Sequence, residues 1–139
     1  MSEEHKAIVR RFYEEVFSRG NLAVADEVVA ANFMEHEAFP GMAPGKEGLK
    51  QMVAMLRAAF PDARMTAGVM LSEGDMVAAQ YTFKGTHRGA FMDIPPTGKE
   101  VTMTGTEILR FAGGKVVEHW GNSDTMGLMQ QLGVIPTPG

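Results

Sequence analysis

The stretch EHWGNSDTMGLMQQLG, residues 118–133, decides how the fold is interpreted, because an extended segment becomes helical within it. It holds the only Trp of the chain, Trp120, and one of its four His, His119. Side chains two residues apart on a strand share a face, so Trp120, Asn122 and Asp124 are predicted to project together. An aromatic wall, an amide and a carboxylate on one face suit a flat organic substrate.

The composition predicts one soluble domain and narrows the class of partner. At 139 residues with 45% hydrophobic content, the chain can bury one core and one pocket, so residues 1–139 are expected to form a single domain. The formal net charge is −4, and the 13 basic residues are scattered, with Arg10 and Arg11 the only adjacent pair. Nucleic-acid binding needs clustered Lys and Arg, so no nucleic-acid partner is expected.

The sequence has neither Cys nor a long apolar segment. Without Cys, disulfides and thiolate metal sites are excluded. Residues 1–6 are acidic and polar, unlike a secretory signal, and no apolar run approaches the length that crosses a bilayer. A cytoplasmic protein without a membrane partner is therefore expected.

Apolar residues recur with helical spacing in the front half of the chain. Ile8, Phe12 and Val16 lie four residues apart, and Gly20 ends the pattern, which predicts a first helix. The segments predicted to follow are a helix at 21–31, an extended piece at 33–37, a loop rich in Pro and Gly at 39–45 and a helix at 46–60.

After Pro61 the hydrophobic period changes to two, which is the period of a β-strand. Gly-containing turns at 73–75 and 112–114 separate pairs of such segments. The predicted strands are 65–71, 77–83, 101–111 and 116–123, with a long loop at 85–99 between the second and the third. Helices followed by long antiparallel strands make an α+β fold, in which this loop can arch over the open end of a curved sheet.

This order of elements, with the ending EHWGNSDTMGLMQQLG, resembles the SnoaL-like polyketide cyclase family, within the superfamily of nuclear transport factor 2 and ketosteroid isomerase. The resemblance covers nearly the whole chain, through VRRFYEEVFSRGN, FMEHEAFPG, GLKQMVAMLRAAFPD and EGDMVAAQYTFKGTHRGAFMDIPPTGK. It implies a cone-shaped, curved antiparallel sheet wrapped around a pocket that the N-terminal helices close. It also implies a homodimer through the outer face of the sheet, where one side of residues 77–83 is expected to expose an apolar row.

The resemblance further implies a catalytic pair. The acid/base of the family is an Asp after the Trp-containing last strand, a place that Asp124 occupies, and a His after the second helix matches His36. The implied reaction is an aldol-type ring closure of a polyketide-like or other apolar carbonyl compound, with no metal and no cofactor. A carbon between two carbonyl groups is already acidic, so one carboxylate with a moderately raised pKa can suffice. The residues assigned to substrate binding are Trp120, Asn122, Tyr13 and Gln80.

Other activities fit the same residue types. A double-bond shift of the ketosteroid isomerase type would use Tyr13 with Glu35 or Glu37. An epoxide hydrolase of the limonene type would need an Asp–Arg–Asp trio, for which Arg110 and Asp124 leave one Asp unassigned. A ligand-binding or dimerisation module without catalysis is the remaining alternative.

Several of the singled-out residues also have a purely structural interpretation. Asp124 precedes a short helical pattern and could be its N-cap. His36 could be an ordinary surface or core residue, and Trp120 could fill the core. Because His119 has the opposite strand parity to Asp124, it is predicted to face solvent or a subunit interface.

Two other apparent motifs do not meet their requirements. Residues 41–47 imitate a phosphate-binding loop, but the spacing is one residue short and Glu47 stands where Ser or Thr would hold magnesium. His36, Glu37, His87 and His119 show no close ligand spacing, so no metal site is expected.

Overall fold

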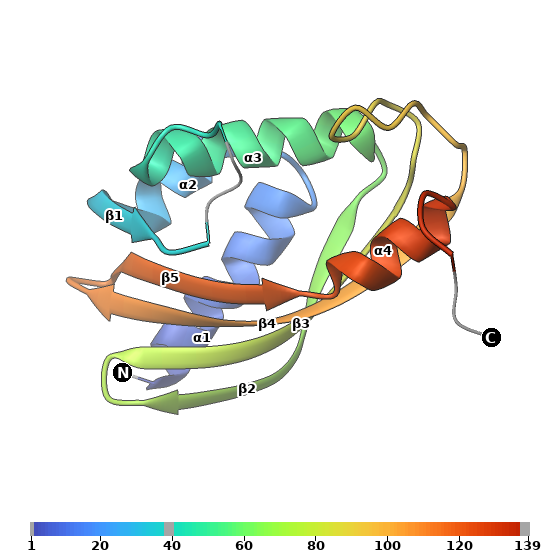
Figure 1. The fold of residues 1–139 in the computed structure, drawn as a ribbon. Helices are drawn as coiled ribbons and strands as arrows, with labels where there is room; N and C mark the ends of the chain where they lie inside the picture. Colours follow the sequence, from blue (N-terminus) through green and yellow to red (C-terminus); the bar gives the residue numbers. More distant parts are fainter. Residues whose placement is uncertain (1, 38–40, 137–139) are drawn as a thin grey trace.

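A curved five-stranded sheet and the helices packed on its inner face make up the computed structural model, which describes residues 2–37 and 41–136 (Figure 1). The helices are α1 (Ser2–Arg11), the π-helix η1 (Phe12–Phe17), α2 (Leu22–Val28), α3 (Gly45–Ala59) and α4 (Thr125–Leu132). The strands are β1 (Val29–Glu35), β2 (Arg64–Glu73), β3 (Met76–Thr86), β4 (Glu100–Ala112) and β5 (Lys115–Ser123). The predicted α+β fold is confirmed; residues 39 and 40 of the predicted loop lie outside the described residues. None of the described helices is long and apolar enough to span a membrane.

The strand order is β1-β5-β4-β3-β2. Strands β2 to β5 pair antiparallel, as predicted, whereas β1 pairs with β5 in parallel and brings Glu35 opposite His119. The helix predicted at 21–31 ends at Val28, and β1 begins at Val29 instead of at residue 33. The reason is tertiary, because the backbone of this segment finds its hydrogen-bonding partner in a strand almost 90 positions later in the chain.

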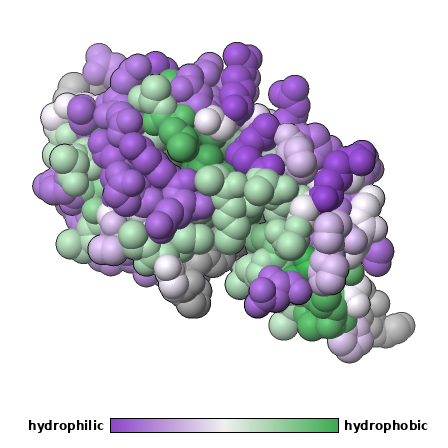
Figure 2. Space-filling view, turned by 90° about the horizontal axis from the view of Figure 1, so that it is seen from above, coloured by the Kyte–Doolittle hydropathy of each residue, from purple (hydrophilic) through white to green (hydrophobic). Residues whose placement is uncertain are grey.

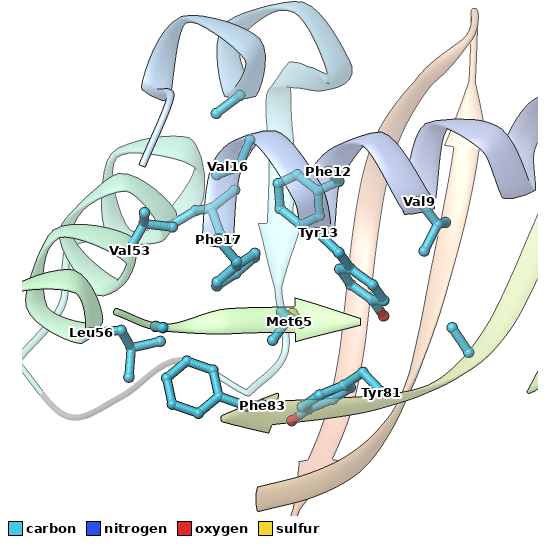
Figure 3. Packing of buried hydrophobic residues seen from close by; sticks show 14 of the residues in the cluster. Val9, Phe12, Tyr13, Val16, Phe17, Val53, Leu56, Met65, Tyr81 and Phe83 are labelled. Carbon is cyan, nitrogen blue, oxygen red and sulfur yellow. The ribbon is translucent and has the colours of Figure 1, made fainter. Parts of the chain in front are cut away.

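The first predicted helix changes from α to π geometry at Phe12. The wider turn is marked by the Ser18 N–H, which donates to the Tyr13 carbonyl five residues earlier at 2.9 Å. The inward-facing residues of this turn are Phe12, Tyr13, Val16 and Phe17, all of which are buried. Tyr13 points from the helix toward the sheet (Figure 3). Such π turns are frequent at functional sites.

The inner face of the sheet carries the core. Val77, Ala79, Tyr81 and Phe83 of β3 are all buried against the helices. The apolar side of this strand therefore faces inward, and the expectation that it forms an exposed row on the outer face is wrong. The other side of the strand presents Ala78, Gln80 and Thr82, which are small or polar.

A β-bulge between Ala67 and Met70 reverses the alternation along β2. An extra residue in one strand turns the following side chains to the opposite face, so Leu71 is 68% exposed. Leu71, Ala78, Ile108 and Trp120 are successive cross-strand partners. These four residues form what we call the outer apolar row of the sheet.

Candidate functional site

A cavity of about 340 Å³ lies between the helices and the inner face of the sheet. This volume is within the roughly 300–1,000 Å³ of small-molecule sites. Most of the wall is apolar, with aromatic rings that include Phe12, Phe17, Phe33, Phe60, Phe83 and Phe91. A flat apolar molecule therefore matches most of the surface that it would contact.

One edge of the cavity is formed by the loop between β3 and β4. Phe91 of this loop is buried in the wall, whereas Met92 lines the cavity and is 48% exposed. Figure 2 shows hydrophobic side chains that reach the surface in the middle of the face seen from above, between hydrophilic areas. The predicted role of the loop as an arch over the open end of the sheet agrees with its place in Figure 1.

Four residues form a connected polar group at one side of the cavity, here called the acid–histidine cluster: Tyr13, Glu35, Glu107 and His119. His119 on β5 bonds through Nδ1 to Glu35 Oε2 and through Nε2 to Glu107 Oε2, the latter at 2.6 Å. The Tyr13 hydroxyl on η1 donates to the other oxygen of Glu107. The side chains of His119, Glu35 and Glu107 are only 16%, 10% and 9% exposed.

Strand register brings this cluster together. His119 lies opposite Leu109 on β4 and Glu35 on β1, while Glu107 lies opposite Gly121. A Cβ added at Gly121 would be only 3.0 Å from His119 Cε1. The missing side chain therefore gives the imidazole room to lean toward Glu107.

The two carboxylates keep the imidazole charged. Burial lowers the pKa of His119, but the hydrogen bonds and negative charges of Glu107 and Glu35 outweigh burial and raise it to about 10. Burial and the adjacent Glu107 carboxylate raise the pKa of the Tyr13 phenol far above its ordinary value. At neutral pH the cluster therefore holds a protonated His119 and a protonated Tyr13.

The cavity wall has an acidic bias. Its ionisable side chains in the part of the chain that the structure describes are Glu35, Glu37, Glu107, His119 and Tyr81, with no Lys or Arg among them. With His119 protonated and the acids ionised, this set carries a net negative charge. Across residues 2–37 and 41–136, no three His, Asp or Glu side chains are placed so that they could jointly hold a metal ion.

The structure places Asp124 outside this cavity. Its carboxylate accepts a hydrogen bond from the Gly127 N–H at 2.9 Å and caps α4. The side chain is exposed and is not part of the cavity wall. The predicted placement of Asp124 in the pocket is therefore wrong, and the alternative of a helix N-cap describes its position.

His36 and Trp120 meet each other, but not in the cavity. Their rings stack with centroids 4.6 Å apart at an angle of 5°. His36 Nε2 lies 2.9 Å from Glu118 Oε2, and the Arg110 guanidinium lies 5.9 Å from the Trp120 ring centroid. Neither His36 nor Trp120 lines the cavity, because Trp120 pairs with the outward-facing Ile108.

The other predicted binding residues divide between two faces of the sheet. Asn122 contributes to the cavity wall, and its role in substrate binding stays a prediction. Tyr13 reaches the site indirectly, through its bond to Glu107. Gln80 is exposed on the outer face, beside a surface hollow that Gly68 and other residues line, and its predicted place in the pocket is wrong.

Sequence reasoning missed His119 and Glu107 as members of one site. Strand alternation correctly placed His119 and Trp120 on opposite faces of β5, but Trp120 was assigned to the buried face. In the structure it is His119 that pairs with the buried Leu109. A usable signal was present in the strand at 101–111. There Glu107 interrupts an alternating row that otherwise holds apolar residues or Gly, and a charge in such a row marks a paired or functional group.

We expect His119 to remain protonated at pH 8 and to titrate near pH 10, because two carboxylates hold its proton. The imidazole carbon and nitrogen chemical shifts, followed by NMR from pH 5 to 11, measure this directly. A midpoint near the ordinary value of about 6.5 would contradict the structure of the cluster.

The same shift predicts how stability depends on pH. A His whose pKa rises on folding contributes stability that is complete below pH about 6.5 and is lost as the pH rises through about 10. The free energy of unfolding in urea should therefore fall between pH 6.5 and 10. His119→Gln serves as the control, since it lacks the titrating group and should lose this part of the pH dependence.

The capping role of Asp124 predicts a contrast between two substitutions. Asn caps helices about as well as Asp, so Asp124→Asn should change the free energy of unfolding little, whereas Asp124→Ala should lower it by about 0.5–2 kcal/mol. Urea unfolding of both variants checks this. An Asp124→Ala variant as stable as the parent would show that the cap contributes nothing.

Comparisons with known proteins show to which family the chain belongs. The model of the SnoaL-like polyketide cyclase family matches residues 7–132. The chain is 26% identical over 119 residues to nogalonic acid methyl ester cyclase of Streptomyces nogalater, covering 84% of this chain and 89% of that one. Among solved structures, it is similar to IdmH, a putative polyketide cyclase from Streptomyces antibioticus, with 33% identity, a TM-score of 0.81 and coverage of 93% and 98% of the two chains.

A second structure shows that the names in this group are not uniform. AclR, a putative hydroxylase from Streptomyces galilaeus, is 27% identical with a TM-score of 0.88, over 100% of this chain and 87% of that one. Members of one fold can thus carry names that refer to different reactions. On the match of its sequence from residue 7 to residue 132, the chain belongs to the SnoaL-like polyketide cyclase family.

Proposed function

We propose that the protein is an enzyme that cyclises a neutral, largely apolar carbonyl compound by proton transfer, with Glu35 as the base. One observation carries the proposal. Glu35 lines the cavity, and its Oε2 accepts from both His119 and the Glu37 N–H, whereas its Oε1 accepts no hydrogen bond from the described residues. Both oxygens of Glu107 are engaged, by Tyr13 and by His119. Glu35 Oε1 is thus the carboxylate oxygen of the cluster that can receive a proton from a substrate.

His119 acts in this proposal as a positioning residue. Both of its ring nitrogens are engaged with carboxylates, so it has no free N–H or lone pair to offer to a ligand. Its hydrogen bond orients the Glu35 carboxylate. When Glu35 takes up a proton, His119 and Glu107 remain as a neutral pair, so the proton enters a cluster that keeps its internal hydrogen bonds.

The proposed reaction is an aldol addition within one molecule. Glu35 removes a proton from a carbon next to a carbonyl group, and that C–H bond breaks to give an enolate. The enolate carbon attacks a second carbonyl carbon of the same substrate, forming a C–C bond and an alkoxide. The alkoxide takes the proton back from Glu35, so the product is an isomer of the substrate and the enzyme is restored.

The charge of the cavity favours a neutral substrate. A carboxylate on the ligand would have to enter an apolar space beside Glu35, Glu37 and Glu107, with no Lys or Arg in the described part of the wall. Like charges in such an environment repel strongly. The name of the Streptomyces nogalater relative refers to a methyl ester, which is a neutral form of an acid and supports this inference.

Exchange of carbon-bound hydrogen for deuterium tests the base. Methyl naphthoylacetate, a neutral aryl β-keto ester, is incubated with the protein in deuterium oxide, and the loss of its central CH₂ signal is followed by proton NMR. Glu35→Gln should lower the enzyme-dependent exchange rate by roughly 10²–10⁴, because the amide cannot accept the proton. Glu73→Gln, at an exposed position at the end of β2, is the matched control and should exchange like the parent.

Two outcomes would contradict this assignment. If Asp124→Asn abolishes exchange while Glu35→Gln retains it, the carboxylate predicted from the sequence is the base after all. If the parent protein binds the ester but adds nothing to the exchange rate in buffer, the chain is a ligand-binding module of the same fold.

We further infer that the protein is a homodimer, joined through the outer apolar row. Leu71 and Ile108 of this row are 68% and 39% exposed, and apolar side chains in a contiguous row indicate an interface. Sedimentation velocity at micromolar concentration should give a dimer, and Ile108→Lys should shift it toward monomer. A parent protein that sediments as a monomer would refute the inference. The cytoplasmic location expected from the sequence stays a prediction.

A further inference from the structure

We propose that Tyr81 and Ser123 form a second recognition point in the cavity, which donates a hydrogen bond to an acceptor oxygen of the ligand, remote from Glu35. The inference rests on the proposed function for the class of ligand, a flat carbonyl compound. Its geometric basis is independent of which residue is the base.

Strand register places the pair. Ala67, Tyr81, Gly105 and Ser123 are successive cross-strand partners on β2, β3, β4 and β5, all on the inner face. The Tyr81 hydroxyl crosses β4 and hydrogen-bonds to Ser123 Oγ. Both residues line the cavity.

Gly105 makes this crossing possible. A Cβ at this position would overlap the Tyr81 phenol, which lies directly above it. With hydrogen as its side chain, Gly105 allows the ring to lie flat across the strand and to reach Ser123. Figure 3 shows Tyr81 on β3, on the side of the core that holds Tyr13 and Phe83.

The number of hydrogens in the pair leaves one donor free. Two hydroxyl groups carry two hydrogens, and their mutual bond uses one of them. The second hydrogen has no acceptor among the other residues that the structure describes. Tyr81 is only 7% exposed, whereas Ser123 is exposed to solvent. A ligand that covers Ser123 leaves this donor without a partner unless the ligand brings an acceptor oxygen, so an acceptor at this point is favoured.

The carboxylates and the imidazole of the acid–histidine cluster do not compete for a carbonyl oxygen, and the other side-chain donors of the described wall are the Asn122 amide and the Thr125 hydroxyl. Ionised Glu35 and Glu107 only accept hydrogen bonds, and both nitrogens of His119 are engaged. Burial raises the pKa of the Tyr81 phenol, and the charge of Glu107 adds to this against the opposing bond from Ser123. Tyr81 therefore remains a donor at neutral pH.

Within the pair, Ser123 is the residue that lies far from His119 and Glu35, whereas the Tyr81 ring packs on Tyr13, with centroids 6.1 Å apart. Ser123 follows His119 by four positions on the same strand, which corresponds to about 13 Å between the two Cα atoms. A ligand that reaches both points must be elongated, as a fused polycyclic compound is. Its acceptor oxygen would bind at Tyr81 and Ser123 while the acidic carbon lies near Glu35.

A matched pair of probes tests the proposal. Acetylnaphthalene carries one carbonyl acceptor and ethylnaphthalene carries none, while their size and shape are similar. Dissociation constants of both probes are measured by NMR titration for the parent, Tyr81→Phe, Ser123→Ala and the double variant. Thr82→Val, which removes a hydroxyl from the outer side of β3, is the control variant.

Because the pair has two hydroxyl hydrogens and uses one of them internally, the two substitutions should have non-additive effects on ligand affinity. Each single variant keeps one free hydroxyl hydrogen, from Ser123 in one case and from Tyr81 in the other, and should bind acetylnaphthalene nearly as the parent does. The double variant has no donor left and should bind it roughly three- to tenfold more weakly. Ethylnaphthalene should bind all five proteins alike.

The result that overturns the proposal is a double variant that binds acetylnaphthalene as tightly as the parent, or one that loses affinity for both probes equally. Thermal unfolding of the double variant near the parental temperature confirms that its fold is intact. Binding to Glu35→Gln separates the two proposals. Loss of deuterium exchange in Glu35→Gln with unchanged acetylnaphthalene affinity supports both proposals. Retained exchange in Glu35→Gln refutes Glu35 as the base, and the recognition pair is then judged by the affinity measurements alone.

Discussion

A protonated imidazole held between two carboxylates is the interaction on which the rest of this site depends. His119 belongs to β5, Glu107 to β4 and Glu35 to β1, and Tyr13 adds η1 to the same group. The cluster therefore joins three adjacent strands to the helical layer. Charges that are taken out of water must be paired, and removing one partner of such a buried pair typically costs about 3–5 kcal/mol. This requirement explains why so many elements converge on a single ring.

The apolar cavity strengthens the electrostatic interactions of the acid–histidine cluster. In water a carboxylate beside an imidazolium is screened, whereas in a cavity with a mainly aromatic wall its interactions are stronger. The glycines on the inner face shape this wall as much as the side chains do. Gly121 leaves room for His119, and Gly105 leaves room for the Tyr81 phenol. Two positions without a side chain thus set the orientation of the polar groups that a ligand would meet.

The two faces of β5 have different chemistry because successive side chains of a strand point in opposite directions. His119, Gly121 and Ser123 face the cavity, while Glu118 and Trp120 lie on the outer face with His36 and Arg110. The outer group is a stack of two rings with ion pairs at the surface, and it shares Trp120 with the outer apolar row. One short strand can in this way contribute to a buried site and to a surface that is suited to contact another subunit.

The sequence by itself determined the α+β fold, the order of its elements and the family, because helical and strand periodicities and the C-terminal motif are local properties of the chain. It also grouped Trp120 with Asn122 by parity, and it named Glu35 and Tyr13 as possible catalytic residues. Only the tertiary structure decided which face of β5 is buried, since this depends on the register with Leu109 of β4. The parallel pairing of β1 and the meeting of Tyr13 with Glu107, 94 positions apart, were decided there as well. Contacts between such distant residues depend on how the sheet curves beneath the helices, and no local period of the sequence encodes that curvature.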